Sequence, residues 1–269
     1  MPERVVFGLA GALIAAAWWL YDGRSRERTP SLESLDDPKV ARAYGWVATM
    51  PPMRLLRWFV VRRAAGMVRR GGAVDLGCGP GQLVIELARR SPALHVTGID
   101  LSDEMIARGQ GNAHRAGLAD RVSFRQGAAQ QIPFTDASLD LVISTLLLHH
   151  WSDPVAVLDE IARVLRPGGS FLIFDLRRDM IAPCWLLLWF ATHVIVPAAL
   201  RRANEPLSSR NAAYTPHEAA RLAAESLAAG GLAGQSCLSG WRVTSGPLWL
   251  TIEGVAAGSV PTTKRHATW

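Results

Sequence analysis

The sequence predicts an α/β fold with a doubly wound, mostly parallel sheet, preceded by a helix that anchors the chain to a membrane or spans it. Two strand–turn–helix units, at 73–90 and 95–115, predict the sheet, because buried parallel strands are apolar and helices repeat apolar residues every three to four positions. An uncharged run at 5–21 predicts the helix. The 269 residues, 49% of them hydrophobic, suffice for one domain with a sizeable core and its attachments.

The N-terminal apolar run is near the short limit for crossing a bilayer core. As a helix, residues 5–21 reach roughly 25 Å. Aromatic residues close the run and arginines follow it, which is typical of an interfacial belt with the basic side in the cytosol. These residues are Trp18, Trp19, Tyr21, Arg24, Arg26 and Arg28. We therefore expect a membrane-anchored protein whose main domain faces the cytoplasm.

Two alternatives stay open for this run. One is a signal peptide cut after Ala17, which would release a soluble protein, although tryptophans rather than a polar mature start follow that site. The other is a helix that docks on the protein or lies in the membrane interface. The expected plan is an anchoring helix at 1–23, a linker leading into the domain at 24–50, the main domain at 51–253 and a tail at 254–269.

Arginines and large apolar residues interleave along residues 53–70. A basic helix with an apolar face suits the surface of an anionic leaflet. The other interpretation is an ordinary helix packed on the sheet edge with its arginines in water. The sequence leaves both open.

A glycine-rich turn follows the first strand. Gly77, Gly79 and Gly81 separate the strand from a helix at 82–90. Glycine allows positive φ and lets a ligand lie against bare backbone, while the helix N-terminus offers unpaired N–H groups to a carboxylate or phosphate. The spacing differs from the Gly-x-Gly-x-x-Gly of dinucleotide sites, so a pyrophosphate cradle is less well supported.

The second strand, at 95–100, ends in Asp100 about twenty residues past the glycines. A carboxylate there can accept hydrogen bonds from both hydroxyls of a bound ribose. Ser102 is a good N-cap for the helix at 103–115. The two units together predict a site for an adenosine-containing cofactor.

Further elements complete the sheet. We expect a fourth strand that ends before His149, a fifth at 170–175, a helix at 216–229, and strands at 235–241 and 248–253.

A second apolar run, at 181–200, falls between the fifth strand and these last elements. Crossing a membrane there would place the remaining strands on the wrong side. We expect a hydrophobic lid or interfacial helix, or a buried cap over an apolar pocket. Its limits and anchors would be Pro183, Trp185, Trp189 and Pro197.

Composition excludes some other classes. The net charge is +6, yet the arginines are spread along the chain without an aromatic-interleaved basic module, so no nucleic-acid partner is expected. The cysteines, Cys78, Cys184 and Cys237, have neither disulfide nor metal-ligand spacing.

Five motifs in this order resemble the class I S-adenosylmethionine-dependent methyltransferases, especially the small-molecule type of ubiquinone and menaquinone biosynthesis. They are VDLGCGPG at 74–81, GIDLS at 98–102 with Met105, VSFRQGAAQQIPF at 122–134, SLDLVISTLLLHHW at 138–151 and LRPGG at 165–169. The resemblance implies a Rossmann-like sheet of seven strands, with S-adenosyl-L-methionine as cofactor and S-adenosyl-L-homocysteine as its product.

The resemblance also implies a role for individual residues. Asp75 and the three glycines would line the methionine end of the cofactor, Asp100 would hold the ribose, and Leu101 with Met105 would flank the adenine. Cys78, Ala128, Ala129 and Ser144 complete the expected cofactor site.

One position departs from the pattern. Similar enzymes usually have Asp where this chain has Ala128, and that carboxylate bonds the adenine amino group. Losing one hydrogen bond costs on the order of 1 kcal/mol, a few-fold to tenfold in affinity. Backbone groups near Ala128 and Ala129, or the Gln130 amide, are the available substitutes.

The expected acceptor is a small lipophilic molecule such as a quinone precursor, lipid, phenol or thiol, handled at a membrane surface with membrane lipid as a partner. If it needs deprotonation, His149 and His150 are the plausible bases, because they follow the fourth strand at the carboxyl edge of the sheet. Neighbouring residues seldom face one pocket. Tyr214 is a further candidate by position. The alternative function is a membrane-tethered cofactor-binding module without transferase activity.

Overall fold

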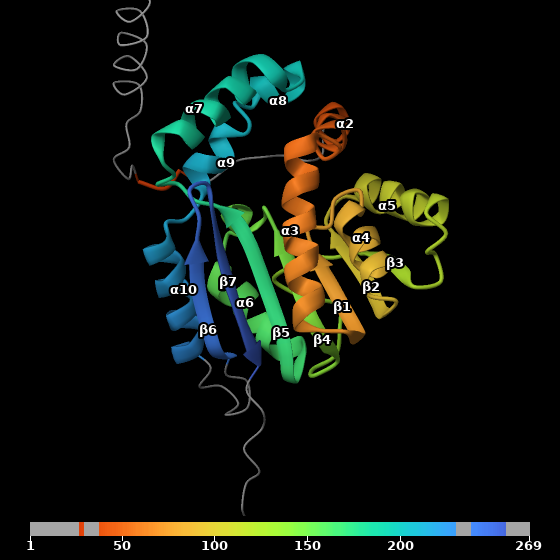
Figure 1. The fold of residues 1–269 in the computed structure, drawn as a ribbon. Helices are drawn as coiled ribbons and strands as arrows, with labels where there is room; N and C mark the ends of the chain where they lie inside the picture. Colours follow the sequence, from red (N-terminus) through yellow and green to blue (C-terminus); the bar gives the residue numbers. More distant parts are fainter. Residues whose placement is uncertain (1–26, 30–37, 230–237, 257–269) are drawn as a thin grey trace, which may run out of the picture.

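The computed structural model describes residues 27–29, 38–229 and 238–256, and they form a single seven-stranded sheet with helices on both faces (Figure 1). The strand order is β3-β2-β1-β4-β5-β7-β6. The first five strands run parallel, whereas β7 is antiparallel to both β5 and β6. The strands are β1 Arg70–Leu76, β2 Ala93–Asp100, β3 Val122–Gln126, β4 Leu139–Thr145, β5 Leu165–Leu176, β6 Leu238–Ser245 and β7 Trp249–Ala256.

Helices connect the strands and precede the sheet. They are α2 Pro38–Val47, α3 Pro51–Met67, α4 Gln82–Arg90, α5 Asp103–Arg115, α6 Pro154–Val164, α7 Ala182–Phe190, α8 Ala198–Arg202, α9 Leu207–Ala212 and α10 Pro216–Ala229. Two short turns add to them, the 3₁₀ turn η1 Leu148–His150 and the π turn η2 Ala191–Ile195.

The core has two halves, one on each face of the sheet. On one face α3 and α4 pack over the strands, with Val60 of α3 and Leu87 of α4 fully buried. On the other face α6 and α10 cover the sheet, with Ile161 and Ala219 fully buried. Apolar side chains on both faces of β1 and β4 make the central strands continuous hydrophobic runs, as parallel strands covered on both sides require.

The sequence prediction of a mostly parallel, seven-stranded Rossmann-like sheet is confirmed. The helices predicted at 82–90, 103–115 and 216–229 have those bounds. The fifth strand begins at Leu165 rather than 170, because residues before the predicted start already pair with β4. The last strand runs to Ala256, so the predicted tail begins three residues too early.

The predicted anchor at 5–21 lies outside the described residues. Within the described ranges, none of the helices combines the length and the apolar character needed to cross a bilayer. The apolar run at 181–200 is divided into α7, η2 and α8. The buried-cap interpretation is wrong for α7, because none of its side chains is buried.

The segment predicted at 53–70 forms α3 as far as Met67, and Arg70 already belongs to β1. One side of α3 is packed against α4 and the sheet, since Val60 and Ala64 are fully buried. The opposite side is exposed and includes Leu55 and Trp58. The helix is therefore a packed element of the domain that keeps an apolar and basic outer side.

Candidate cofactor and acceptor site

The glycine turn after β1 has the conformation that the sequence predicts. Gly77, Gly79 and Gly81 all have positive φ, and the amides of Gly77 and Cys78 both donate to the Ile99 carbonyl at 2.8 and 3.0 Å. These bonds hold the turn against the end of β2. The turn and the first residues of α4 therefore lie at the carboxyl edge of the sheet.

The absence of a side chain has a different consequence at each of the three glycines. A Cβ on Gly77 would lie 2.7 Å from the Leu147 side chain, and one on Gly81 would lie 2.5 Å from the Phe124 ring. A Cβ on Gly79 would meet no atom within 4 Å. Gly77 and Gly81 thus make room for packed side chains, whereas Gly79 presents bare backbone to open space.

Asp100 organises the turn from the end of β2. One carboxylate oxygen accepts the Gly79 amide at 2.8 Å and the other accepts the Ser102 amide at 3.0 Å. Burial raises the pKa of this carboxyl, while these backbone bonds oppose the rise. Each carboxylate oxygen has a second lone pair, so Asp100 retains acceptor capacity for a ligand's hydroxyls.

Asp75 and Cys78 lie buried under the turn. Burial raises the pKa of Asp75 well above its usual value, and the nearby Asp100 charge adds to the effect. Burial also raises the pKa of the Cys78 thiol, which acts as a packed apolar group rather than a nucleophile. The Asp75 Oδ1 atom has no hydrogen-bond partner among the described residues. Two close carboxyls with an unmatched buried oxygen favour a cationic ligand.

The residues assigned to the adenine side are divided between surface and core. Leu101 is 67% exposed, whereas Met105 is 3% exposed and supports it from the first turn of α5. Ala128 and Ala129 are half-buried, and the Ala128 carbonyl accepts the Gln131 amide at 3.1 Å. The Gln130 side chain, one of the predicted substitutes for the missing carboxylate, donates instead to Ser152 at 3.4 Å.

Ser144, which is also assigned to the cofactor site, is fully buried. It pairs with Leu76 across β4 and β1, and its hydroxyl donates to the Leu76 carbonyl at 3.3 Å. Ser144 therefore links the two strands that carry the site, one layer below the turn.

His149 is held by a carboxylate at the end of β5. Its Nδ1 lies 2.8 and 2.9 Å from the two oxygens of Asp175, and its backbone amide donates to Asp175 at 2.9 Å. Both side chains are about 2% exposed. A ring fixed in this way keeps one tautomer and one orientation, which suits a positioning role.

His150 is the more exposed of the two histidines. Its ring centre lies 4.1 Å from that of His149, so these neighbours do share one side, contrary to expectation, because they lie in the tight turn η1. Burial, followed by the charge of His149, lowers the pKa of His150 to about 4. Its imidazole is therefore neutral at pH 7, the form that can accept a proton.

Arg28 joins the N-terminal segment to this cluster. Its guanidinium donates to the Ala212 carbonyl at 2.7 Å and to the His149 carbonyl at 3.0 Å. It also lies 4.4 Å from the centre of the Tyr214 ring. Tyr214 is 8% exposed, and burial raises the pKa of its hydroxyl. Arg28 thus contacts both the His149 backbone and the Tyr214 ring, while the role predicted for Tyr214 at the acceptor stays a prediction.

The structure brings the cofactor and acceptor candidates to one edge of the sheet. Leu147 touches Gly77 and directly precedes η1, so the glycine turn adjoins the two histidines. Sequence reasoning missed Asp175 and Arg28. Asp175 ends a buried strand, as Asp100 does, and that shared pattern could have found it. Nothing in the sequence around Arg28 signals its contacts.

Part of the chain is similar in sequence to known methyltransferases. Residues 74–173 match the methyltransferase domain family model. A curated relative from Amycolatopsis mediterranei, a 27-O-demethylrifamycin SV methyltransferase, is 40% identical over 42% of this chain and 42% of its own length. A demethylmenaquinone methyltransferase of Porphyromonas gingivalis is 34% identical over 45% of this chain and 51% of its own. The matches thus span about half of these relatives.

A solved structure gives the same fold. Phosphoethanolamine N-methyltransferase 2 of Haemonchus contortus, in complex with S-adenosyl-L-methionine, matches with a TM-score of 0.61 at 17% identity, over 83% of this chain and 59% of its own. Residues 74–173 are thus similar to a methyltransferase domain, and the solved structure shows that the fold is shared.

The residues present fit S-adenosyl-L-methionine, the cofactor bound in that solved structure. The unmatched buried oxygen of Asp75 suits a cationic group, and the open space at Gly79 leaves room along the backbone. Asp100 has acceptor capacity for the ribose, and the exposed Leu101 offers an apolar surface to the adenine.

Proposed function

We propose that this protein transfers a methyl group from S-adenosylmethionine to a small lipophilic acceptor at the cytosolic surface of a membrane. The observation that carries the proposal is the common edge shared by the glycine turn and the His149–His150 pair, with Leu147 packed between them. The relatives named for a rifamycin derivative and for demethylmenaquinone support an acceptor of this size and character.

The bound cofactor supplies a methyl group already activated on a sulfonium, so the protein's task is mainly to bind and align. Asp100 offers acceptors for the ribose hydroxyls, a cationic cofactor would favour the charged form of the buried Asp75, and the Gly79 backbone leaves room for it. His150, neutral at pH 7, can accept a hydrogen bond from the hydroxyl or thiol of an acceptor, and its pKa of about 4 makes the imidazole a weak base. His149 supports it from below, held in orientation by Asp175.

The lipophilic character of the acceptor is supported by the surface at this end of the sheet. The segment that follows β5 exposes large apolar side chains around α7 and η2. These residues, which we call the α7 surface, are Ile181, Leu186, Leu187, Trp189, Phe190, Val194 and Ile195. Membrane anchoring through residues 5–21, with the domain in the cytoplasm, would place this surface next to the bilayer, into which lipophilic acceptors partition.

The test is a transfer assay with the detergent-solubilised full chain, S-adenosylmethionine labelled in its methyl group, and a cell extract split into lipid and aqueous fractions. We expect label in the lipid fraction, and none with the Asp100→Ala variant. Label only in the aqueous fraction would refute the lipophilic acceptor. Intact cofactor binding with no transfer to either fraction would favour the binding-module alternative.

A further inference from the structure

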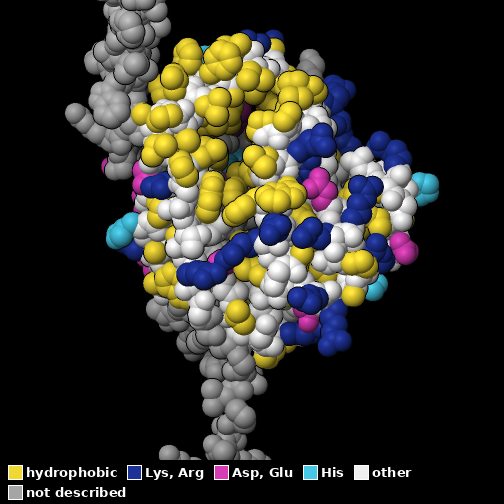
Figure 2. All heavy atoms as spheres, in the orientation of Figure 1, with side chains coloured by type: hydrophobic (Ala, Val, Ile, Leu, Met, Phe, Trp, Pro, Cys, Tyr) yellow, Lys and Arg dark blue, Asp and Glu magenta, His cyan; other side chains and the backbone are white. Residues whose placement is uncertain are grey.

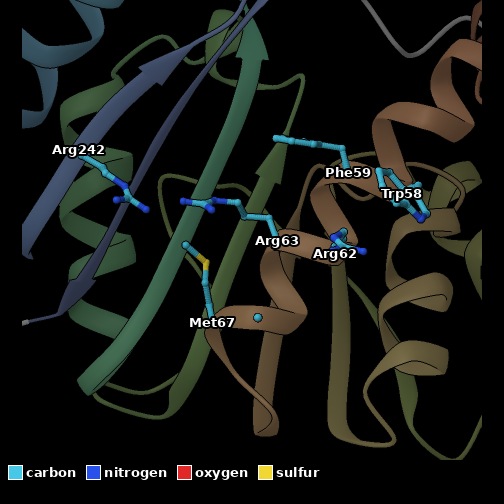
Figure 3. A pocket seen from close by; sticks show the side chains of 7 residues that line it. Trp58, Phe59, Arg62, Arg63, Met67 and Arg242 are labelled. Atoms are coloured by element: carbon cyan, nitrogen blue, oxygen red, sulfur yellow. The ribbon is translucent and has the colours of Figure 1, made fainter.

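A cavity lies on the outer face between α3 and β6, lined by none of the cofactor or acceptor candidates (Figure 3). Its volume is about 570 Å³. Three arginines and three large apolar side chains line it, and we call it the arginine groove. They are Arg62, Arg63, Arg242, Trp58, Phe59 and Met67.

The arginine groove has an excess of positive charge. Arg63 and Arg242 both form ion pairs with Glu253, whose side chain is 2% exposed (Figure 3 shows the two arginines pointing toward one another). One carboxylate thus fixes two guanidinium groups. Arg62 has no carboxylate partner among the described residues, and its guanidinium carbon lies 5.6 Å from the centre of the Trp58 ring. Three positive charges therefore face one buried negative charge.

The exposed side of α3 combines apolar and basic residues, with Arg54 before Leu55 and Trp58, and Arg62 after them. Leu55, Trp58 and Arg62 lie three and four residues apart, which places them on one stripe of the helix. Leu55 is 67% exposed and Trp58 is 54% exposed. Figure 2 shows a broad hydrophobic surface at this end of the molecule, with a row of basic side chains directly below it.

This combination of exposed apolar and basic side chains suits the boundary between the acyl chains and the headgroups of a lipid leaflet. Apolar side chains enter the acyl region, tryptophan prefers the boundary, and arginine contacts the headgroups. Guanidinium groups bind phosphate oxygens through paired, charge-assisted hydrogen bonds. A free anion would use the arginines and leave the adjoining apolar surface in water.

We propose that the arginine groove binds the headgroup phosphate of an anionic phospholipid, so that the domain docks on the bilayer with the α7 surface turned into it. This inference rests on the membrane part of the proposed function, not on methyl transfer itself. Each basic residue near an anionic leaflet contributes about 1 kcal/mol, so each arginine lost should weaken lipid binding about fivefold.

The full chain is prepared in non-ionic detergent micelles that contain phosphatidylglycerol or phosphatidylcholine. Native mass spectrometry then releases the protein from the micelle and measures how much lipid stays bound to it. The detergent covers any apolar N-terminal segment equally in all samples. The variants are Arg62→Gln alone and with Arg242→Gln, while Arg63 stays to neutralise Glu253. Arg221→Gln is the matched control, because Arg221 is exposed on α10, across the sheet from α3.

We expect the chain to retain phosphatidylglycerol in preference to phosphatidylcholine, with about fivefold weaker binding in the single variant and a further loss in the double variant. Arg221→Gln should bind as the parent does. Equal retention of the two lipids, or no loss in the double variant, would overturn the proposal. Displacement of the lipid by inorganic phosphate at equal concentration would assign the groove to a free anion instead.

Methyl transfer to the lipid fraction of the cell extract, measured on the same samples, separates the two proposals. If the groove proposal alone fails, transfer remains while lipid preference is absent. If the proposed function fails, no variant transfers the methyl group whatever its lipid binding.

Discussion

The two halves of the carboxyl edge are built in different ways. The cofactor half uses backbone and carboxylates from one stretch, where Gly79, Asp100 and Ser102 are joined by hydrogen bonds over some two dozen residues. The acceptor half collects His149, Asp175 and their neighbours Arg28 and Tyr214 from four separate segments.

The difference follows from what each half must bind. A cofactor of fixed shape is held by a turn whose geometry depends on glycines and one strand end. The residues that form this site are therefore close in the sequence, and their pattern can be recognised there. An acceptor is recognised by side chains that the fold brings together from distant positions, and the same fold serves many acceptors. The two halves should therefore respond separately to substitution.

The largest effect should come from Asp100→Ala. The variant removes the carboxylate that holds Gly79 and Ser102 and that would accept the ribose hydroxyls. Two lost charge-assisted bonds correspond to about 3 kcal/mol or more, a hundredfold weaker cofactor binding. Calorimetric titration with S-adenosylhomocysteine measures it, and an unchanged dissociation constant would remove Asp100 from the site.

Paired glycine variants sharpen the comparison within the cofactor half. Gly81→Ala should lower the free energy of unfolding by about 2 to 3 kcal/mol, because its Cβ would press on the Phe124 ring in a backbone conformation that alanine resists. Gly79→Ala meets no atom, so it adds only the backbone strain of its positive φ and should chiefly weaken cofactor binding. Urea unfolding measures the stability of both variants, and calorimetry measures their cofactor affinity. An equal decrease in the free energy of unfolding in the two variants would contradict the different roles of Gly79 and Gly81.

The low pKa of His150 predicts a pH-dependent stability. Its folded pKa of about 4 lies below the ordinary value of 6.5, so between these pH values the unfolded chain binds a proton that the folded chain does not. The free energy of unfolding should therefore fall as pH drops, by about 2 kcal/mol between pH 6.5 and 5.

The comparison with His150→Gln isolates this effect, because the buried carboxyls Asp75 and Asp100, whose raised pKa values act in the opposite direction, are present in both proteins. Urea unfolding at each pH should give a shallower acid loss in the variant. Parallel stability curves would show that His150 is not buried as described.

Asp175→Asn should affect the acceptor half alone. The amide keeps the shape but loses the charged partner of His149, so the ring orientation and tautomer are less fixed. We expect about tenfold slower methyl transfer, with cofactor affinity unchanged within about twofold. Single-turnover kinetics measures the rate of methyl transfer, and calorimetry measures the cofactor affinity. An equally large loss of cofactor affinity would contradict the independence of the cofactor half and the acceptor half.

The smallest effect is a gain. Ala128→Asp restores the carboxylate that similar enzymes use for the adenine amino group, next to a turn whose backbone is already in place. Cofactor affinity should rise a few-fold to tenfold, the value of one hydrogen bond. Ala129→Asp is the matched control, since the neighbouring position should not reproduce the gain.

The cofactor half was predictable because its signals are local. Apolar strands, positive-φ glycines and the Ser102 cap each act within a few residues, and they placed α4 and α5 correctly. The acceptor half was predicted only as His149, His150 and Tyr214. Asp175 and Arg28 reach them through tertiary contacts that leave no periodic pattern, and the tight turn η1 brings together rings that a strand would have separated.

A single-turnover experiment tests the central claim most directly. The detergent-solubilised full chain is loaded with methyl-labelled S-adenosylmethionine, freed of excess cofactor, and mixed with a lipid extract. We expect label to pass from the protein into an organic-soluble product as fast as S-adenosylhomocysteine forms, and about tenfold more slowly with Asp175→Asn. Label that stays in the bound cofactor throughout would contradict it.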